Sequence, residues 1–172
     1  MTVNVSFALL DAAVIGGQGD EPVVGEMTHA RLLEEVAAFA GVLGHLGVRV
    51  AVPVVIDLEP DFDAVVAALA AARLGGVVTA DDHPDAPVAV VSSGSQVPAA
   101  GRVRIVSGVS VQDPDLEWGA MIRAGRTEPA ACEVLAPGAA YSRERSVAEQ
   151  IEVLARSVPP YTAAELRRLL QV

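Results

Sequence analysis

The clearest hydrophobic pattern in the chain lies between Ala30 and Leu46. Apolar residues recur there at intervals of three and four positions, which places them on one stripe of a helix: Leu32, Leu33, Val36, Phe39, Ala40, Leu43 and Leu46. Thr28 stands where a helix N-cap is expected, and Gly44 with Gly47 supplies a stop. The pattern therefore predicts a helix from about Ala30 to Leu46.

A nearly unbroken β-branched run follows from Val48 to Ile56. Such a run is typical of a strand covered on both faces. Pro53 cannot donate a ladder hydrogen bond, so we expect it at an edge or at the end of the paired segment. Apolar spacing from Phe62 to Leu74 predicts an alanine-rich second helix, which Gly75-Gly76 ends, and Val77–Thr79 predicts the next strand.

The order helix, strand, helix, strand predicts the fold class. A crossover through a helix joins parallel strands and is right-handed in nearly all sheets. We therefore expect an α/β fold with three layers, a mainly parallel sheet flanked by helices. Smaller elements complete it: a helix at Val5–Val14, a turn at Gly16–Gly19, and strands at Pro22–Val24 and Val88–Val91.

The last 31 residues predict two further helices. Ser146-Val-Ala-Glu149 and Thr162-Ala-Ala-Glu165 are both capping boxes, which open helices to about Val158 and from Ala163 to Leu170. The expected domain organisation is one α/β subdomain over residues 1–141, with the helical pair of residues 142–172 packing on the same domain. We expect that pair to cap the sheet.

Composition narrows the classes of function. The formal net charge is −10 at pH 7, and a basic surface is what phosphate neutralisation requires, so nucleic acid is not an expected partner. The chain contains no lysine, which rules out a Schiff base and a phosphate-loop lysine. No apolar run is long enough to span a bilayer and no signal peptide is evident, so a protein free of the membrane is expected, with a cytoplasmic location.

Three segments carry a family resemblance. They are the helix opening at Thr28-His29-Ala30-Arg31-Leu32, the stretch Leu46-Gly47-Val48-Arg49-Val50-Ala51-Val52, and Ala67-Ala68-Leu69-Ala70 through Leu74-Gly75-Gly76-Val77-Val78. They resemble the N-terminal subdomain of the adenylate-forming enzymes, the acyl-CoA synthetase superfamily. The family has Gly-Asp in the middle segment, and this pair is absent between Arg49 and Val50.

Later segments resemble the acetyl- and propionyl-CoA synthetase branch. They are Ser93-Gly94-Ser95-Gln96 to Gly101-Arg102-Val103, Asp115-Leu116-Glu117-Trp118, and Ala131-Cys132-Glu133-Val134 with Pro137 to Tyr141. In that branch the arginine of the Gly-Arg turn contacts the phosphates of CoA. The resemblance thus implies a CoA site with these candidate residues: Ser93, Gly94, Ser95, Gly101, Arg102 and Arg104. The alternative is that the two arginines are surface residues at the start of a strand.

The resemblance ends before the family's ATP phosphate loop. After Tyr141 the chain continues with Ser142-Arg143-Glu144-Arg145, and the family's catalytic lysine has no counterpart. No catalytic residue and no adenylation activity are therefore expected. The leading hypothesis is a truncated, non-catalytic relative that acts as an accessory or interaction protein, with a protein partner or a second copy. One alternative is a CoA or acyl-CoA binding protein using Arg102 and Arg104. The other is a small enzyme of different chemistry on the same scaffold.

The remaining chemical groups give weaker signals. Asp81, Asp82, His83 and Asp85 form a cluster that a solvated turn explains as well as a metal site does. Asp57, Glu59, Asp61 and Asp63 resemble part of a calcium loop without its glycine and its final glutamate. The single Cys132 is expected to be a semi-buried thiol, and Trp118 is expected to pack in the core.

Overall fold

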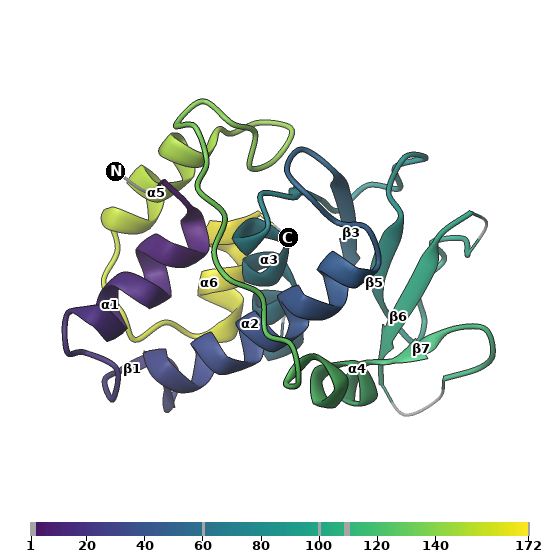
Figure 1. Ribbon diagram of the computed structural model, residues 1–172, viewed down its shortest axis with the longest axis horizontal. Helices are drawn as coiled ribbons and strands as arrows, with labels where there is room; N and C mark the ends of the chain where they lie inside the picture. The colour runs from purple at the N-terminus through teal and green to yellow at the C-terminus, as the bar shows by residue number, and fades with distance from the viewer. Residues whose placement is uncertain (1–2, 60, 100, 109–110, 172) are drawn as a thin grey trace.

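A five-stranded sheet, all of whose pairings are parallel, forms one end of the protein (Figure 1). The computed structural model describes residues 3–59, 61–99, 101–108 and 111–171. The strand order is β4-β3-β5-β6-β7, and the bounds are β3 Pro53–Asp57, β4 Val77–Thr79, β5 Val88–Ser92, β6 Val103–Ser107 and β7 Leu116–Glu117. A separate antiparallel pair is formed by β1 Pro22–Val24 and β2 Met27–Thr28.

Helices cover one face of this sheet. Their bounds are α2 His29–His45, α3 Phe62–Arg73 and α4 Trp118–Gly125, and each begins after a residue whose side chain caps it. Helix α3 packs on β3 and β4, α4 packs on β6, and α2 packs against both helices. Alternate strand residues, among them Val54, Val90 and Ile105, point into this main core. The predicted α/β class, with a parallel sheet flanked by helices, is confirmed.

The other face of the sheet carries a second, smaller apolar cluster. Its strand residues are Val55, Ala89, Val91 and Val106, and loop residues rather than a helix cover them: Ala86, Val97 and Val111. The strands are apolar on both faces, as the β-branched runs predicted. The helices therefore lie on one side of the sheet, and among the described residues the third layer expected on the other side consists of loops and not of helices.

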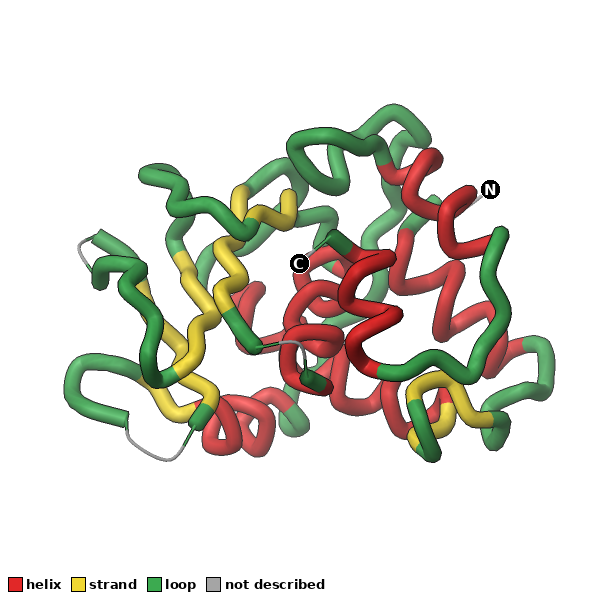
Figure 2. The backbone as a smooth tube through the Cα atoms, turned by 180° about the vertical axis from the view of Figure 1, so that it is seen from behind, coloured by secondary structure: helices red, strands yellow, loops and turns green. Residues whose placement is uncertain are grey.

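The remaining helices lie at the end of the molecule away from the sheet (Figures 1 and 2). They are a π-helical turn, η1 Phe7–Asp11, which continues into α1 Ala12–Ile15, and the C-terminal pair α5 Val147–Ala155 and α6 Ala163–Leu170. Both predicted capping boxes are present, at Ser146 and at Thr162.

Helix α6 packs against α3, whereas the sequence predicts that the C-terminal pair caps the sheet. The reason lies in α3, in which every residue from 64 to 73 is buried. A helix that is apolar all round needs cover on the side away from the sheet as well. Leu166 and Leu170 of α6 supply that cover and are themselves fully buried.

Tyr141 ties the C-terminal pair to the edge of the sheet. Its side chain is fully buried, and its hydroxyl donates a hydrogen bond to the carbonyl oxygen of Leu170 at 2.8 Å. Burial raises the pKa of Tyr141 far above its ordinary value. The next residue, Ser142, forms a parallel bridge with Val78 of β4. The segment after Tyr141 thus extends the outer side of β4.

The strand predicted from Val48 begins only at Pro53. The five residues before it form a turn. The Val48 N–H donates a hydrogen bond to the carbonyl of Leu43 at the end of α2, and Ala51 adopts a left-handed φ of 65°. Pro53 takes the first strand position, where its missing N–H does least harm to the ladder. A β-branched run alone does not reveal where pairing starts.

Candidate functional site

The predicted CoA-site residues lie at opposite ends of the strands, some at the carboxyl ends and others at the amino ends. Strands β5 and β6 run parallel with Val88 beside Val103 and Ser92 beside Ser107. Residues 93–95 follow the carboxyl end of β5, whereas Gly101 and Arg102 precede the amino end of β6. Arg102 is level with residue 87 of the neighbouring chain segment, so six strand steps separate it from Ser93, about 20 Å at ~3.3 Å per residue.

The serine loop after β5 is held by a carboxylate of the neighbouring strand. Ser95 Oγ donates a hydrogen bond to Asp57 Oδ2 at 2.5 Å, and Ser95 Oγ also accepts from the Val97 N–H at 3.1 Å. Ser93 and Gly94 are exposed. The loop therefore has fixed geometry at Ser95 and an open surface at the two residues before it.

Arg102 and Arg104 are both matched with acids. Arg102 Nη1 lies 2.6 Å from Asp82 Oδ1, and its side chain is only 4% exposed. Arg104 Nη1 lies 3.7 Å from Asp115 Oδ2, with 18% of its side chain exposed. Among the residues that the structure describes, the Nε atom of each guanidinium group is buried and has no hydrogen-bond partner. Both arginine side chains are thus largely covered and ion-paired, and each has one donor without a partner among those residues.

A polar pocket lies elsewhere, between α2, the first turn of α3 and one side of α4. We call it the Asp63 pocket; its volume is about 360 Å³, and its polar and aromatic lining consists of Glu35, Phe62, Asp63, Trp118, Arg123 and Arg126. Helix α3 follows β3, and α4 follows β7, so the pocket opens at the carboxyl edge of the sheet. Ligands of open parallel sheets bind at this edge.

Asp63 is the electrostatic centre of this pocket. Ser107 Oγ, at the end of β6, donates a hydrogen bond to Asp63 Oδ2 at 2.5 Å. Burial raises the pKa of Asp63 above its ordinary value, and the nearby charges of Asp61 and Glu35 raise it further. Hydrogen bonds from Ser107 and, less strongly, Trp118 oppose this rise. A half-buried carboxyl group with a raised pKa in a pocket is typical of a functional site.

Both cations of the pocket are already paired with glutamates. Arg126 Nη2 lies 2.5 Å from Glu35 Oε1, and Arg123 Nη2 lies 3.6 Å from Glu117 Oε2. Within the described ranges, no Arg or His side chain forms an ion pair with Asp63. Its charge is therefore offset by neutral donors alone.

Sequence reasoning missed this pocket. The sequence places Asp63 in an acidic turn that only partly resembles a calcium loop, and it places Trp118 in the core. Trp118 does pack against Phe39, with ring centroids 4.3 Å apart, but it also lines the pocket. The order of the elements could have revealed the pocket. Polar residues follow the carboxyl ends of β3, β6 and β7, and in a parallel sheet these ends meet on the same side.

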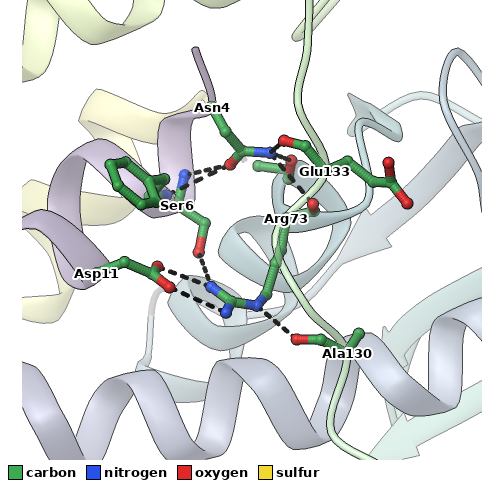
Figure 3. A network of polar contacts seen from close by, with 8 residues as sticks. Asn4, Ser6, Asp11, Arg73, Ala130 and Glu133 are labelled. Carbon is green, nitrogen blue, oxygen red and sulfur yellow. Dashed lines mark hydrogen bonds and ion pairs between the residues drawn. The ribbon is translucent and has the colours of Figure 1, made fainter. Parts of the chain in front are cut away.

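A buried polar network around Arg73 is structural (Figure 3). Arg73 makes a two-point ion pair with Asp11, at 2.8 and 3.0 Å, and its Nε donates to the Ala130 carbonyl at 2.8 Å. The Asn4 amide donates to the carbonyls of Arg73 and Glu133. The network joins the N-terminal segment, the end of α3 and the strand-like segment after α4, and its donors point at protein groups.

Cys132 lies beside this network and is half-buried. Burial raises the pKa of its thiol to about 11, and the nearby Arg73 charge offsets only part of this effect. The thiolate is the nucleophilic form, so Cys132 is almost entirely in its unreactive form at neutral pH.

The other candidates contribute no converging ligand set. Asp82 is paired with Arg102, and His83 Nδ1 accepts the Asp85 N–H at 3.3 Å. In the part of the chain that the structure describes, no three His, Cys, Asp or Glu side chains converge where a metal ion could bind. None of the described helices has the length and hydropathy that a membrane crossing requires.

Comparison with solved structures places this fold among CoA ligases. The anthranilate CoA ligase AuaEII, solved with anthranoyl-AMP, matches 82% of this chain with a TM-score of 0.67 and 17% identity. The acetoacetyl-CoA synthetase from Streptomyces lividans matches 82% with a TM-score of 0.66 and 24% identity. The benzoate CoA ligase from Burkholderia xenovorans LB400 matches 81% with a TM-score of 0.65 and 20% identity.

These matches cover only a part of each ligase, 32%, 28% and 32% of its length respectively. No family model matches the sequence, and no curated protein does so. At these identities the likeness concerns the fold. The chain therefore has the fold of roughly one third of an acyl-CoA or aryl-CoA ligase, the α/β subdomain that its sequence motifs predicted.

Proposed function

We propose that this chain is a non-catalytic relative of the acyl-CoA synthetases and acts as an accessory or interaction protein. The observation that carries this function is the absence of lysine from the sequence, because the resemblance implies a lysine in the ATP phosphate loop that follows Tyr141.

The segment after Tyr141 supports the same function. The resemblance implies an ATP phosphate loop there, and in this chain the segment is used for packing. Ser142 Oγ donates to Gln171 Oε1 at 3.0 Å, and Arg145 Nη1 donates to Gln150 Oε1 at 2.9 Å. These contacts bind residues 142–145 to α5 and to the end of α6, so the segment is held where a flexible loop would have to wrap a nucleotide.

An interaction role requires a docking surface, and the apolar groove between α2 and α4 offers one. The groove has a volume of about 270 Å³ and is lined by Val42, Leu46, Met121 and Ala124, with His45 and Glu128 paired on its rim at 3.1 Å. A buried apolar anchor inside a polar rim is the arrangement that protein interfaces favour. We propose that a partner protein places an apolar side chain in this groove.

An Ala124→Glu substitution tests this role, because Ala124 is exposed and lines the groove. We expect the partner that co-purifies with the wild-type chain in stoichiometric amount to be lost from the variant. Ala155→Glu is the matched control, since Ala155 is also an exposed alanine in the last turn of a helix but lies on α5. Equal recovery of the partner with both variants contradicts docking in the groove.

The absence of adenylation is tested separately, by exchange of pyrophosphate into ATP in the presence of a carboxylic acid. We expect no exchange above a protein-free blank, because the preorganised charges that accelerate such a step, worth ~10²–10³ in rate each, are not present in this chain. A full-length benzoate CoA ligase serves as the positive control. Exchange that co-purifies with the chain contradicts the non-catalytic assignment.

A CoA-type ligand is the second candidate, and the unused donors of Arg102 and Arg104 favour it. Guanidinium donors two residues apart at the start of β6 suit a phosphate. If CoA binds there, CoA at 100 times its Kd raises the free energy of unfolding by about 2.7 kcal/mol in a thermal-shift titration. The shift should vanish in Arg102→Ala and persist in Arg156→Ala. No shift with the wild-type chain rejects this candidate.

A further inference from the structure

The Asp63 pocket has an electrostatic imbalance that the accessory role does not explain. Arg123 and Arg126 each have a glutamate partner, whereas the donors that face Asp63 in the described part of the chain are neutral, the hydroxyl of Ser107 and the indole of Trp118. A half-buried carboxylate without a cation is costly, and burial together with neighbouring acids disfavours its charged form. A cation placed at Asp63 would relieve this cost.

Asp63 is not needed as a helix cap. Asp61 caps α3, with its Oδ1 accepting the Ala64 N–H at 3.2 Å. The Asp63 side chain instead reaches across to Ser107 at the end of β6, 44 residues away in the chain. The position of the Asp63 side chain is therefore determined by its contact across the pocket and not by capping of α3.

The rest of the pocket suits a flat apolar body. Trp118 is held in place by its contact with Phe39, at 4.3 Å between ring centroids and an interplanar angle of 45°. Phe62, Val66 and Ile122 add apolar surface beside it. Pockets of a few hundred Å³ with apolar walls and a few convergent polar groups are typical of small-molecule sites, and an aromatic face attracts a cation directly.

We propose that the Asp63 pocket binds a small organic cation, an amidinium or primary ammonium group carried on a flat apolar body. The cationic group lies against the Asp63 carboxylate, with which an amidinium makes two parallel hydrogen bonds, and the flat body lies against Trp118. This site is separate from the groove between α2 and α4, so its failure leaves the accessory role untouched, and the reverse also holds.

Benzamidine is the probe, and the fluorescence of Trp118 is the signal. Trp118 is the single tryptophan of the chain, so a change in its emission reports on this pocket. We expect a saturable change with a Kd in the millimolar range or tighter. Benzoate has the same ring with the opposite charge, and we expect it to give no saturable change.

The variant Asp63→Asn should weaken the binding of benzamidine at least tenfold, since the substitution removes the negative charge of the side chain and keeps its shape. Because the pKa of Asp63 is raised on folding, its ionisation opposes folding as the pH rises above 3.8. Asp63→Asn is therefore expected to stay folded at neutral pH, and a melting curve checks this. Asp81→Asn is the control, an exposed acid outside the pocket with the same change in net charge.

Three results would overturn the cation site. Benzamidine could give no saturable signal up to about 10 mM, a concentration that fills most of a site with a Kd of 1 mM. Asp63→Asn could bind it as tightly as the Asp81→Asn control. Benzoate could bind more tightly than benzamidine, which would assign the pocket to anions held by Arg123 and Arg126. The comparison of the two probes uses the wild-type chain and does not depend on any variant folding.

Discussion

Replacing Gly41 by alanine is expected to lower the free energy of unfolding by about 3 kcal/mol, the upper part of the range for overpacking a close contact. A Cβ atom at this position would overlap the carbonyl oxygen of Glu128, which belongs to the segment following α4. That segment is fixed on α2 by the Ala130 N–H, which donates to the Ala37 carbonyl at 2.9 Å. Backbone cannot move aside as a flexible side chain can, so the helix and the segment must separate.

Gly44→Ala is the matched control on the same helix. A Cβ atom there would meet only Leu74 Cδ1, at 3.8 Å, an ordinary contact. Alanine is favoured over glycine in a helix by about 1 kcal/mol, so this variant should be more stable than the wild-type chain. Thermal unfolding followed by circular dichroism separates the two, with Gly41→Ala melting about 6–12 °C below wild type. Equal melting temperatures for the two variants would show that the close approach at Gly41 is not a constraint.

Replacing Arg73 by alanine is expected to cost about 3 kcal/mol, because it leaves the Asp11 carboxylate without its cation in a largely buried place. Arg73 is 8% and Asp11 16% exposed in their side chains. The substitution also removes the donor to the Ala130 carbonyl. Urea unfolding measures the effect as a shift in the transition midpoint.

Arg156→Ala is the control for the loss of an arginine. Arg156 pairs with Glu152 at 3.7 Å, with 77% and 70% of the two side chains exposed, and such pairs contribute at most about 1 kcal/mol. The double variant Arg73→Met with Asp11→Leu should recover part of the loss, since it removes both charges together. If Arg73→Ala unfolds at the same urea concentration as Arg156→Ala, the ion pair contributes no more than a surface pair.

Local sequence patterns predicted those helices whose position depends on their own residues and not on distant contacts. Helix α2 follows from its apolar stripe and its Thr28 cap, and α5 and α6 follow from their capping boxes. The start of β3 could not be predicted in this way, because the left-handed turn at Ala51 depends on a hydrogen bond from its N–H to Gly75, which is distant in sequence. The packing of α6 on α3 likewise depends on how many sides of α3 need cover.

The candidate site was the least predictable part. Asp63 and Ser107 meet only because the strand order β3-β5-β6 brings the ends of separate strands to one edge of the sheet. The motif resemblance selected Ser93, Ser95, Arg102 and Arg104, which share a chain segment but lie toward different edges. Proximity in sequence is therefore a poor guide here, because the connection from β5 to β6 must return along the length of a five-residue strand.

The sheet has little capacity to grow by addition of a strand from another molecule. On the outer side of β4 the Val78 N–H donates to the Tyr141 carbonyl at 2.9 Å, so this edge is already hydrogen-bonded. At the other edge β7 has only two residues, too few for a stable ladder. Continuous intermolecular sheets, the route to fibrils and to β-augmentation, are thus disfavoured at both edges of the five-stranded sheet.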